Sequence, residues 1–238
     1  MSTIHVIIPA AGKSVRMGGP VPKILMEVSG VPVIIRTLQA FDKDWGEYTI
    51  RAVVVTGESL IDEVEALIKQ YKISCVAAVV KGGDSRTESV ALGVKALDGI
   101  CGEDDIVFVH DGARCLVDED TISDCISTMQ KHNVCVASVP VKSTIKTIGI
   151  TAAGEQKVIS TPDRGSLAEV QTPQCFRYGI IKKCCEYAIE NDVVATDDTA
   201  LAEMLGYSVY LTRGSYSNIK ITTTEDIPLA EEIIRRRS

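Results

Sequence analysis

Residues 4–17 read IHVIIPAAGKSVRM, and this stretch decides the fold that the rest of the chain completes. The apolar run Ile4–Ile8 has the length of one buried strand, and small residues from Pro9 to Gly12 follow it directly. A buried strand that runs into a glycine-containing loop is typical of α/β proteins, whose ligands bind at the carboxyl edge of the sheet. The stretch therefore indicates both a fold class and a place to look for a site.

The same alternation continues through the first half of the chain. Apolar runs alternate with stretches in which apolar residues recur at helical spacing. We expect strands at residues 51–55, 75–80, 106–109 and 134–139, and helices at residues 33–41, 60–71, 85–97 and 119–132. This βαβα order predicts an α/β fold with a mostly parallel sheet flanked by helices.

The regular order breaks near Pro140. Two β-rich stretches, 144–150 and 157–160, flank a turn at 151–154 and predict a hairpin arm at about residues 140–162. An isolated hairpin is marginally stable in water, so we expect the arm to pack on another surface, such as a second subunit. Beyond it, we expect helices at 178–190, 198–205 and 225–236 and strands at 208–212 and 219–222.

Length and composition exclude several classes of protein. The 238 residues suit one large α/β domain spanning residues 1–238, and 45% apolar against 24% charged residues is ordinary globular composition. A net charge of −7 offers no general attraction for nucleic acid or an anionic membrane. No apolar stretch is long enough to span a bilayer and the N-terminus does not resemble a signal peptide, so we expect a cytoplasmic protein. The eight cysteines are scattered without a C-x-x-C pair, which disfavours a zinc site or a disulfide framework.

The first loop is the strongest candidate for binding phosphate. Small residues let the backbone approach a ligand, and the cations Arg16 and Lys23 could neutralise charge on a phosphoryl group. The alternative is a plain turn with solvated basic residues. The loop matches neither common nucleotide motif: a P-loop would need glycine at Ile7, and a dinucleotide fingerprint would need glycine at Ser14 and Met17.

Residues 82–89, GGDSRTES, follow another predicted strand and form a second glycine-rich segment whose backbone could come close to a ligand. Ser89 would lie near the start of the following helix, where it could donate to a ligand. The alternative is a helix N-cap by Asp84 or Ser85 with Glu88 completing a capping box. Both can hold, because capping and ligand binding use the same end of a helix.

The fourth predicted strand ends in VHDGAR, residues 109–114. Asp111 could hold Mg²⁺ or a substrate hydroxyl, and Arg114 could hold a phosphate or a neighbouring carboxylate. A structural Asp111–Arg114 pair is the alternative. His110 is next to Asp111 in sequence, so it points to the other side of the strand, and we expect it to be part of the core.

The remaining polar clusters are each a turn, a cap or a surface charge when taken singly. The chain shows no Ser–His–Asp or Cys–His pattern at a recognisable spacing. Cations in loops at strand ends, without a nucleophile or redox motif, favour phosphoryl or nucleotidyl transfer by positioning and electrostatics.

Taken together, the motifs resemble the 2-C-methyl-D-erythritol 4-phosphate cytidylyltransferases of non-mevalonate isoprenoid synthesis. The resemblance spans Ile7 to about Glu231, and its landmarks occur in the family's order: PAAGKSVRM with PK, GGDSR with Ser89, HDGAR, PVKST, DR before QTPQ, TDD and SNIKIT. The DGAR form of the third landmark favours this family over the related ribitol-phosphate cytidylyltransferases. The chain departs from the family pattern at Ser14 in the first loop, at Ile24 after Lys23, and at Cys115 after HDGAR.

The resemblance implies a nucleotide-diphosphosugar transferase-like fold and a homodimer made through the arm. It implies CTP binding by Ala10, Ala11, Gly12, Gly83, Asp84 and Ser89, with Mg²⁺ bound mainly through the CTP phosphates. The implied catalytic cations are Arg16, Lys23 and Lys220. Asp111 and Arg114 would bind the methylerythritol part of the substrate, and Thr144 and Arg164 of a partner's arm would hold its phosphate.

The implied reaction is transfer of CMP from CTP to 2-C-methyl-D-erythritol 4-phosphate with release of pyrophosphate. Two alternatives stay open at this stage: a ribitol-5-phosphate cytidylyltransferase and a non-catalytic nucleotide-binding module. A dehydrogenase is disfavoured because the dinucleotide glycines are missing.

Overall fold

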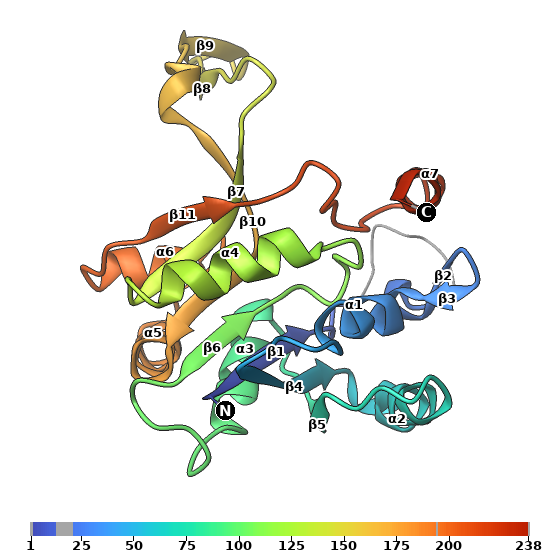
Figure 1. The fold of residues 1–238 in the computed structure, drawn as a ribbon. Helices are drawn as coiled ribbons and strands as arrows, with labels where there is room; N and C mark the ends of the chain where they lie inside the picture. Colours follow the sequence, from blue (N-terminus) through green and yellow to red (C-terminus); the bar gives the residue numbers. More distant parts are fainter. Residues whose placement is uncertain (1, 13–20, 194, 238) are drawn as a thin grey trace.

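The computed structural model describes residues 2–12, 21–193 and 195–237, and its centre is a seven-stranded sheet (Figure 1). The strand order is β11-β7-β10-β6-β1-β4-β5. All neighbouring strands run parallel except β10, which is antiparallel to both β6 and β7. The strands are β1 (Ser2–Pro9), β4 (Tyr48–Thr56), β5 (Val76–Lys81), β6 (Ile106–Val109), β7 (Val134–Pro140), β10 (Ala168–Arg177) and β11 (Tyr210–Arg213). The predicted mostly parallel α/β sheet is confirmed.

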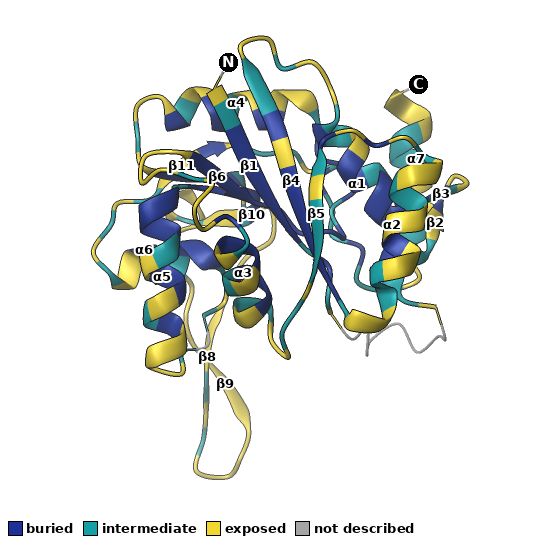
Figure 2. Ribbon diagram, turned by 90° about the horizontal axis from the view of Figure 1, so that it is seen from below, coloured by how far each residue is buried: buried dark blue, intermediate teal, exposed yellow. Residues whose placement is uncertain are grey.

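Helices cover both faces of the sheet because both faces of its strands are apolar. In β1, Ile4, Val6 and Ile8 pack into one core cluster, whereas Ile7 packs into the other, as the two-residue period of a strand requires. The first cluster is covered by α1 (Val33–Phe41), α2 (Ile61–Gln70) and α4 (Glu119–Met129). The second is covered by α3 (Arg86–Lys95), α5 (Tyr178–Glu190) and α6 (Asp198–Met204), and Figure 2 shows the buried strands between the two layers.

A smaller third cluster joins the N-terminal hairpin to the last helix. The hairpin strands β2 (Glu27–Val28) and β3 (Val31–Pro32) pack near α7 (Asp226–Arg237). Ser29 and Gly30 both have positive φ, +47° and +73°, which is the conformation of a tight type I′ hairpin turn. Short 3₁₀ turns in the described parts of the chain are η2 (Lys23–Leu25), η3 (Glu58–Leu60) and η4 (Arg164–Ser166).

The arm projects from the body where β7 ends and β10 begins (Figure 1). It consists of β8 (Thr147–Ile150) and β9 (Gln156–Ser160), which pair antiparallel with each other as a separate two-stranded sheet. The predicted hairpin is thus confirmed. Its apolar side chains are exposed in this single chain: Ile145, Ile148, Ile150, Val158 and Ile159.

Two features of the second half differ from the sequence-based expectation. Strand β10 was not predicted, because its QTPQ segment contains a proline and three polar residues; the structure accommodates them with a register shift between Val170 and Gln174. The strand expected at residues 219–222 is wrong. That segment is a loop. Its apolar residues suggested a strand, but they pack against the third cluster, in which Ile221 is buried beneath α7.

Of the helices that the structure describes, none combines the length and the apolar character that crossing a bilayer requires.

Candidate active site

A cavity of about 270 Å³ opens at the carboxyl edge of the parallel strands. Three chain segments that follow strands meet there: the loop after β1, the start of α3 after β5, and the loop after β6. Parallel strands place their following loops at one edge of the sheet, which is where α/β proteins bind ligands. The described lining residues are Pro9, Ala10, Ala11, Gly12, Lys23, Ile24, Gly83, Asp84, Ser85, Arg86, Ser89, Asp111, Ala113 and Lys220.

The first and second glycine loops are in direct contact. The backbone N–H of Ala10 donates to the carbonyl of Val55 at 2.7 Å, which holds the loop against β4. A Cβ added at Gly82 would lie 2.5 Å from the Cβ of Ala11 and 2.9 Å from the hydroxyl of Ser89. Only glycine therefore permits the two loops to approach so closely. Lys23 lines the cavity, whereas Arg16 lies outside the described residues.

The start of α3 is fixed by the capping box that the sequence predicts. Ser85 is the N-cap: its hydroxyl accepts from the N–H of Glu88 at 3.1 Å, and the Glu88 carboxylate accepts from the N–H groups of Asp84 and Ser85. The Ser89 hydroxyl donates to the Ser85 carbonyl at 2.9 Å and accepts from the N–H of Gly83 at 3.2 Å. Ser89 therefore shapes the loop that faces the cavity as well as lining it.

Asp111 is surrounded by three cations at the floor of the cavity. Its carboxylate lies 2.8 Å from the Lys220 ammonium, 3.3 Å from Nε of Arg86 and 3.5 Å from Nε of Arg114. Burial by itself would raise the pKa of Asp111, but Arg86, then Lys220 and Arg114, overcome that effect and hold the pKa well below its usual range. Asp111 is thus an ionised anchor that directs the three cations into one place.

Arg86 has a second carboxylate partner that sequence analysis missed. Its Nη1 and Nη2 each lie 2.8 Å from one oxygen of Asp198, which is almost fully buried at the start of α6. Burial raises the pKa of Asp198, and the Arg86 guanidinium opposes this rise. Arg86 stood within the GGDSR motif and Asp198 within TDD, but they are 112 residues apart, and no local spacing connects them.

The QTPQ segment of β10 pins the loops that carry these charges. The Thr172 hydroxyl accepts from the N–H of Asp111 at 3.1 Å, and the Thr172 carbonyl accepts from the side-chain amide of Asn218 at 2.8 Å. The side-chain oxygen of Gln174 accepts from the N–H of Asp198 at 2.9 Å. The QTPQ segment therefore supports the charged cluster, a role that its sequence taken singly does not reveal.

His110 is a core residue, as the sequence predicts. It is fully buried, with Nε2 3.1 Å from the Arg114 carbonyl and Nδ1 3.0 Å from the Thr172 hydroxyl. Burial lowers its pKa to about 4, so the imidazole is neutral at pH 7.

The remaining predicted residues lie around the cavity or on the arm. Arg114 supports the floor, because Nη1 donates to the Asn218 carbonyl at 2.7 Å. Thr144 and Arg164 are near the base of the arm and are not among the described lining residues of this cavity. Arg164 donates to the Lys142 carbonyl at 2.9 Å, which closes the arm at its base.

The family model described as IspD, 2-C-methyl-D-erythritol 4-phosphate cytidylyltransferase, matches residues 4–236 of the chain. The chain belongs to this family.

Curated and solved relatives agree with this membership over nearly the whole chain. The 2-C-methyl-D-erythritol 4-phosphate cytidylyltransferase of Halalkalibacterium halodurans is 40% identical over 98% of this chain and 97% of its own length. That of Desulforamulus reducens is 40% identical over 100% of this chain and 98% of its own.

Solved structures of the family share the fold. The 4-diphosphocytidyl-2C-methyl-D-erythritol synthase of Anaerococcus prevotii has a TM-score of 0.83 and 29% identity, with 98% of this chain and 96% of that chain covered. The Francisella tularensis cytidylyltransferase has a TM-score of 0.77 and 28% identity, with 97% and 99% covered. As a member of this family, the chain is a cytidylyltransferase, which rules against a non-catalytic module.

Proposed function

We propose that the chain transfers CMP from CTP to 2-C-methyl-D-erythritol 4-phosphate, forming 4-diphosphocytidyl-2-C-methyl-D-erythritol and pyrophosphate. The observation that carries the proposal is the cationic cluster of Arg86, Arg114 and Lys220 around Asp111, set beside two glycine loops in one cavity. Glycine loops suit the backbone contacts that a nucleotide needs, and the cations suit two phosphate-bearing substrates.

The reaction joins two phosphates and needs no protein nucleophile. A phosphate oxygen of the polyol substrate attacks the α-phosphorus of CTP, and the bond between that phosphorus and the oxygen bridging to the β-phosphate breaks. The electron pair of this bond leaves with pyrophosphate. The attacking oxygen is already anionic, so no general base is required. His110 is buried, and its ring nitrogens face the Arg114 carbonyl and the Thr172 hydroxyl, so it is not placed to act as a base; this agrees with the mechanism.

The chain's own contribution is positioning and charge. We assign Lys23 and Lys220, together with Arg16 of the same first loop, to the stabilisation of negative charge that moves from the α-phosphorus to the leaving group. Lys220 has three N–H donors, so its contact with Asp111 leaves others for a phosphate oxygen. Asp111 and Arg114 are proposed to bind the methylerythritol hydroxyls.

A magnesium ion carried by CTP fits the described cavity. Asp84 and Asp111 are the acidic side chains of its lining, and Asp111 is already neutralised by three cations. Mg²⁺ commonly binds through one or two carboxylates plus substrate phosphates and keeps several waters. When bound, the ion would draw negative charge away from the phosphates, and Asp84 would be the carboxylate of the lining that holds it.

The arm is proposed to make a homodimer. Its apolar side chains are strongly exposed, for example Ile150 at 79% and Ile159 at 64%, and a two-stranded hairpin alone is marginal in water. Packing against the arm of a second copy would cover these side chains. It would also bring Thr144 and Arg164 to the partner's cavity, where they would hold the phosphate of the polyol substrate.

Pyrophosphate release tests the reaction. The purified enzyme is given CTP and Mg²⁺ with either 2-C-methyl-D-erythritol 4-phosphate or ribitol 5-phosphate. Release with the first acceptor alone is expected; release with ribitol 5-phosphate alone would overturn the proposed substrate.

Light scattering tests the dimer. Replacing Ile150 with Asp should give a monomer with little turnover, whereas Met204→Asp, at a similarly exposed position on α6, should leave the dimer intact. An Ile150→Asp protein that remains dimeric would contradict the arm as the interface.

A further inference from the structure

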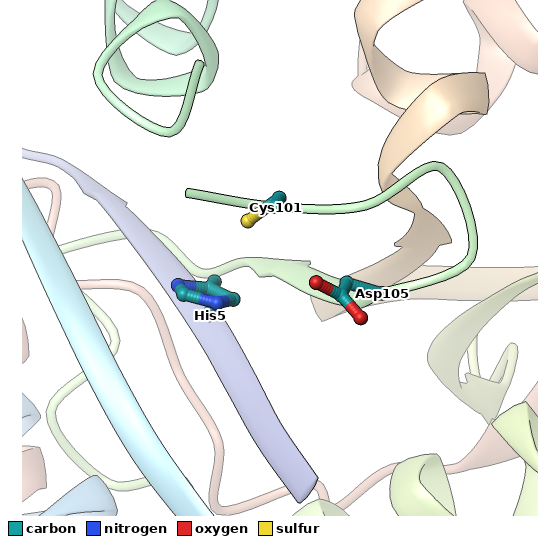
Figure 3. Close-up of side chains that lie close together, drawn as sticks. All are labelled: His5, Cys101 and Asp105. Atoms are coloured by element: carbon teal, nitrogen blue, oxygen red, sulfur yellow. The ribbon is translucent and has the colours of Figure 1, made fainter. Parts of the chain in front are cut away.

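A second cluster of ligand-type side chains lies toward the amino ends of β1 and β6, whereas the cavity lies at their carboxyl ends. Figure 3 shows the three side chains. It consists of His5 on β1, with Cys101 and Asp105 on the loop that precedes β6. One nitrogen, one sulfur and one carboxylate oxygen from these residues lie within 4.8 Å of one another. Ala10 is five positions after His5, just beyond the end of β1, and five steps of extended chain span roughly 16 Å.

The backbone holds all three side chains in place. His5 is paired in register with Arg51 of β4 and Val107 of β6, in the interior of the sheet. The loop is tied at both ends: the N–H of Cys101 donates to the Leu97 carbonyl at 3.1 Å, and the carbonyl of Asp105 accepts from the N–H of Tyr178 at 2.8 Å. The cluster is thus fixed by the sheet and by a short, anchored loop.

The Asp105 carboxylate also shapes that loop. One of its oxygens accepts from the N–H of Gly102 at 2.9 Å, while Figure 3 shows the carboxylate on the same side of β1 as the His5 ring. An acidic group held in this way keeps acceptor capacity for a cation.

The donor set has a clear chemical preference. Imidazole nitrogen, thiolate sulfur and carboxylate oxygen are the ligands of zinc, whereas magnesium and calcium select oxygen alone. Of the eight cysteines, all of which lie in described parts of the chain, only Cys101 is not buried. His5 and Asp105 line a solvent-open hollow of about 580 Å³ that provides a path of entry.

We propose that His5, Cys101 and Asp105 form a binding site for one zinc-class divalent cation, with water as the fourth ligand. The bound ion joins the loop before β6 to β1. On binding, the Cys101 thiol releases its proton to solvent and the sulfur coordinates as thiolate.

The protonation states of the free residues agree with this chemistry. Burial lowers the pKa of His5, which leaves a neutral imidazole, the form that binds metals. Burial, and then the charge of Asp105, raises the pKa of Cys101 to about 11, so a cation is needed to hold a thiolate there at neutral pH.

Cobalt spectroscopy on the untagged, chelator-treated full chain tests the site. Titration with Co²⁺ should produce a sulfur-to-cobalt charge-transfer band that saturates at one equivalent, and Zn²⁺ should displace it. Cys101→Ser should abolish the band, and His5→Asn or Asp105→Asn should weaken Zn²⁺ binding by roughly tenfold to a hundredfold or more.

Matched controls separate the site from other cysteines and histidines. Cys185→Ala removes a buried thiol and His132→Asn removes a histidine stacked on Tyr210; both should leave the band unchanged. Circular dichroism and Mg²⁺-supported turnover show whether each variant folds. A wild-type chain without the band, or a folded Cys101→Ser chain that keeps it, would overturn the proposal.

Discussion

The anchoring of Arg86 by Asp198 gives a sharp test of how the cluster is built. Replacing Asp198 with Asn keeps the shape of the side chain but removes its charge, and an amide NH₂ takes the place of one of the two oxygens that now lie 2.8 Å from the Arg86 guanidinium nitrogens. The amide NH₂ would face a guanidinium N–H, donor against donor. Arg86 would retain Asp111, 3.3 Å away, as its remaining carboxylate partner.

The size of the effect follows from these contacts. Hydrogen bonds to a charged group are worth about 1.5–3 kcal/mol, and the burial cost of the Asp198 carboxylate, shown by its raised pKa, is relieved in the variant. We therefore expect a loss of about 1–3 kcal/mol in the free energy of unfolding. For a chain of this size that lowers Tm by roughly 3–10 °C. In the variant, Arg86 would shift toward Asp111 and weaken the contact between Asp111 and Lys220. Because Lys220 would then be less well positioned, kcat/KM should fall by about tenfold or more.

The neighbouring residue provides the control. Asp197 is the N-cap of α6, where its carboxylate accepts from the N–H of Ala200 at 2.8 Å, and asparagine caps a helix about equally well. Asp197→Asn removes the same charge one residue away and should leave both Tm and pyrophosphate release nearly unchanged. If Asp198→Asn behaves like Asp197→Asn in thermal unfolding and in turnover, Arg86 needs no second anchor and the reasoning fails.

Three other changes test the cavity itself. Lys23→Ala should lower turnover by roughly a hundredfold, since it removes one charge donor that lines the cavity; near-normal pyrophosphate release would exclude that role. Gly82→Ala should weaken CTP binding measured by calorimetry, because its Cβ would lie 2.5 Å from that of Ala11, whereas Gly154→Ala on the arm turn should not. The pKa of Asp111 is lower in the folded chain than in the unfolded chain. Its carboxylate therefore contributes its full share to the free energy of unfolding above about pH 4, and this share is lost as the pH falls toward the pKa of the folded state. Asp111→Asn should therefore be less stable than wild type at pH 7 and lose less stability between pH 4 and pH 2 in denaturant titrations.

Local pattern predicted the regular elements well. The helices Val33–Phe41 and Tyr178–Glu190 and the strand Ile106–Val109 have the predicted bounds, because their apolar spacing and their place in the core agree. The same reasoning failed for β10, where buried polar side chains replace the usual apolar run. Polar residues can be buried there because each one bonds a neighbouring loop.

The residues of the candidate site that directly follow strands could be predicted from the sequence. Those whose role depends on a partner far away in the chain could not. The loops after β1, β5 and β6 meet because parallel strands place their ends together. The Arg86–Asp198 pair and the His5–Cys101–Asp105 cluster join residues about a hundred positions apart, and no motif spacing can reveal such contacts. The local spacing of cysteines and histidines disfavours a zinc site, but that spacing concerns only ligands close together in the chain.

The position of β10 has a consequence for synthesis on the ribosome. Strand β7 leaves the ribosome well before β10, yet its only neighbours among the described strands of the sheet are β10 and β11, both made later. The nascent chain can pair β1, β4, β5 and β6 with one another as soon as they are made, whereas β7 has no described strand partner until β10, which begins at Ala168, follows it. The enzyme thus acquires the support of its catalytic floor only after β6 has been made, and Lys220, which contacts Asp111, follows both β10 and β11 in the chain.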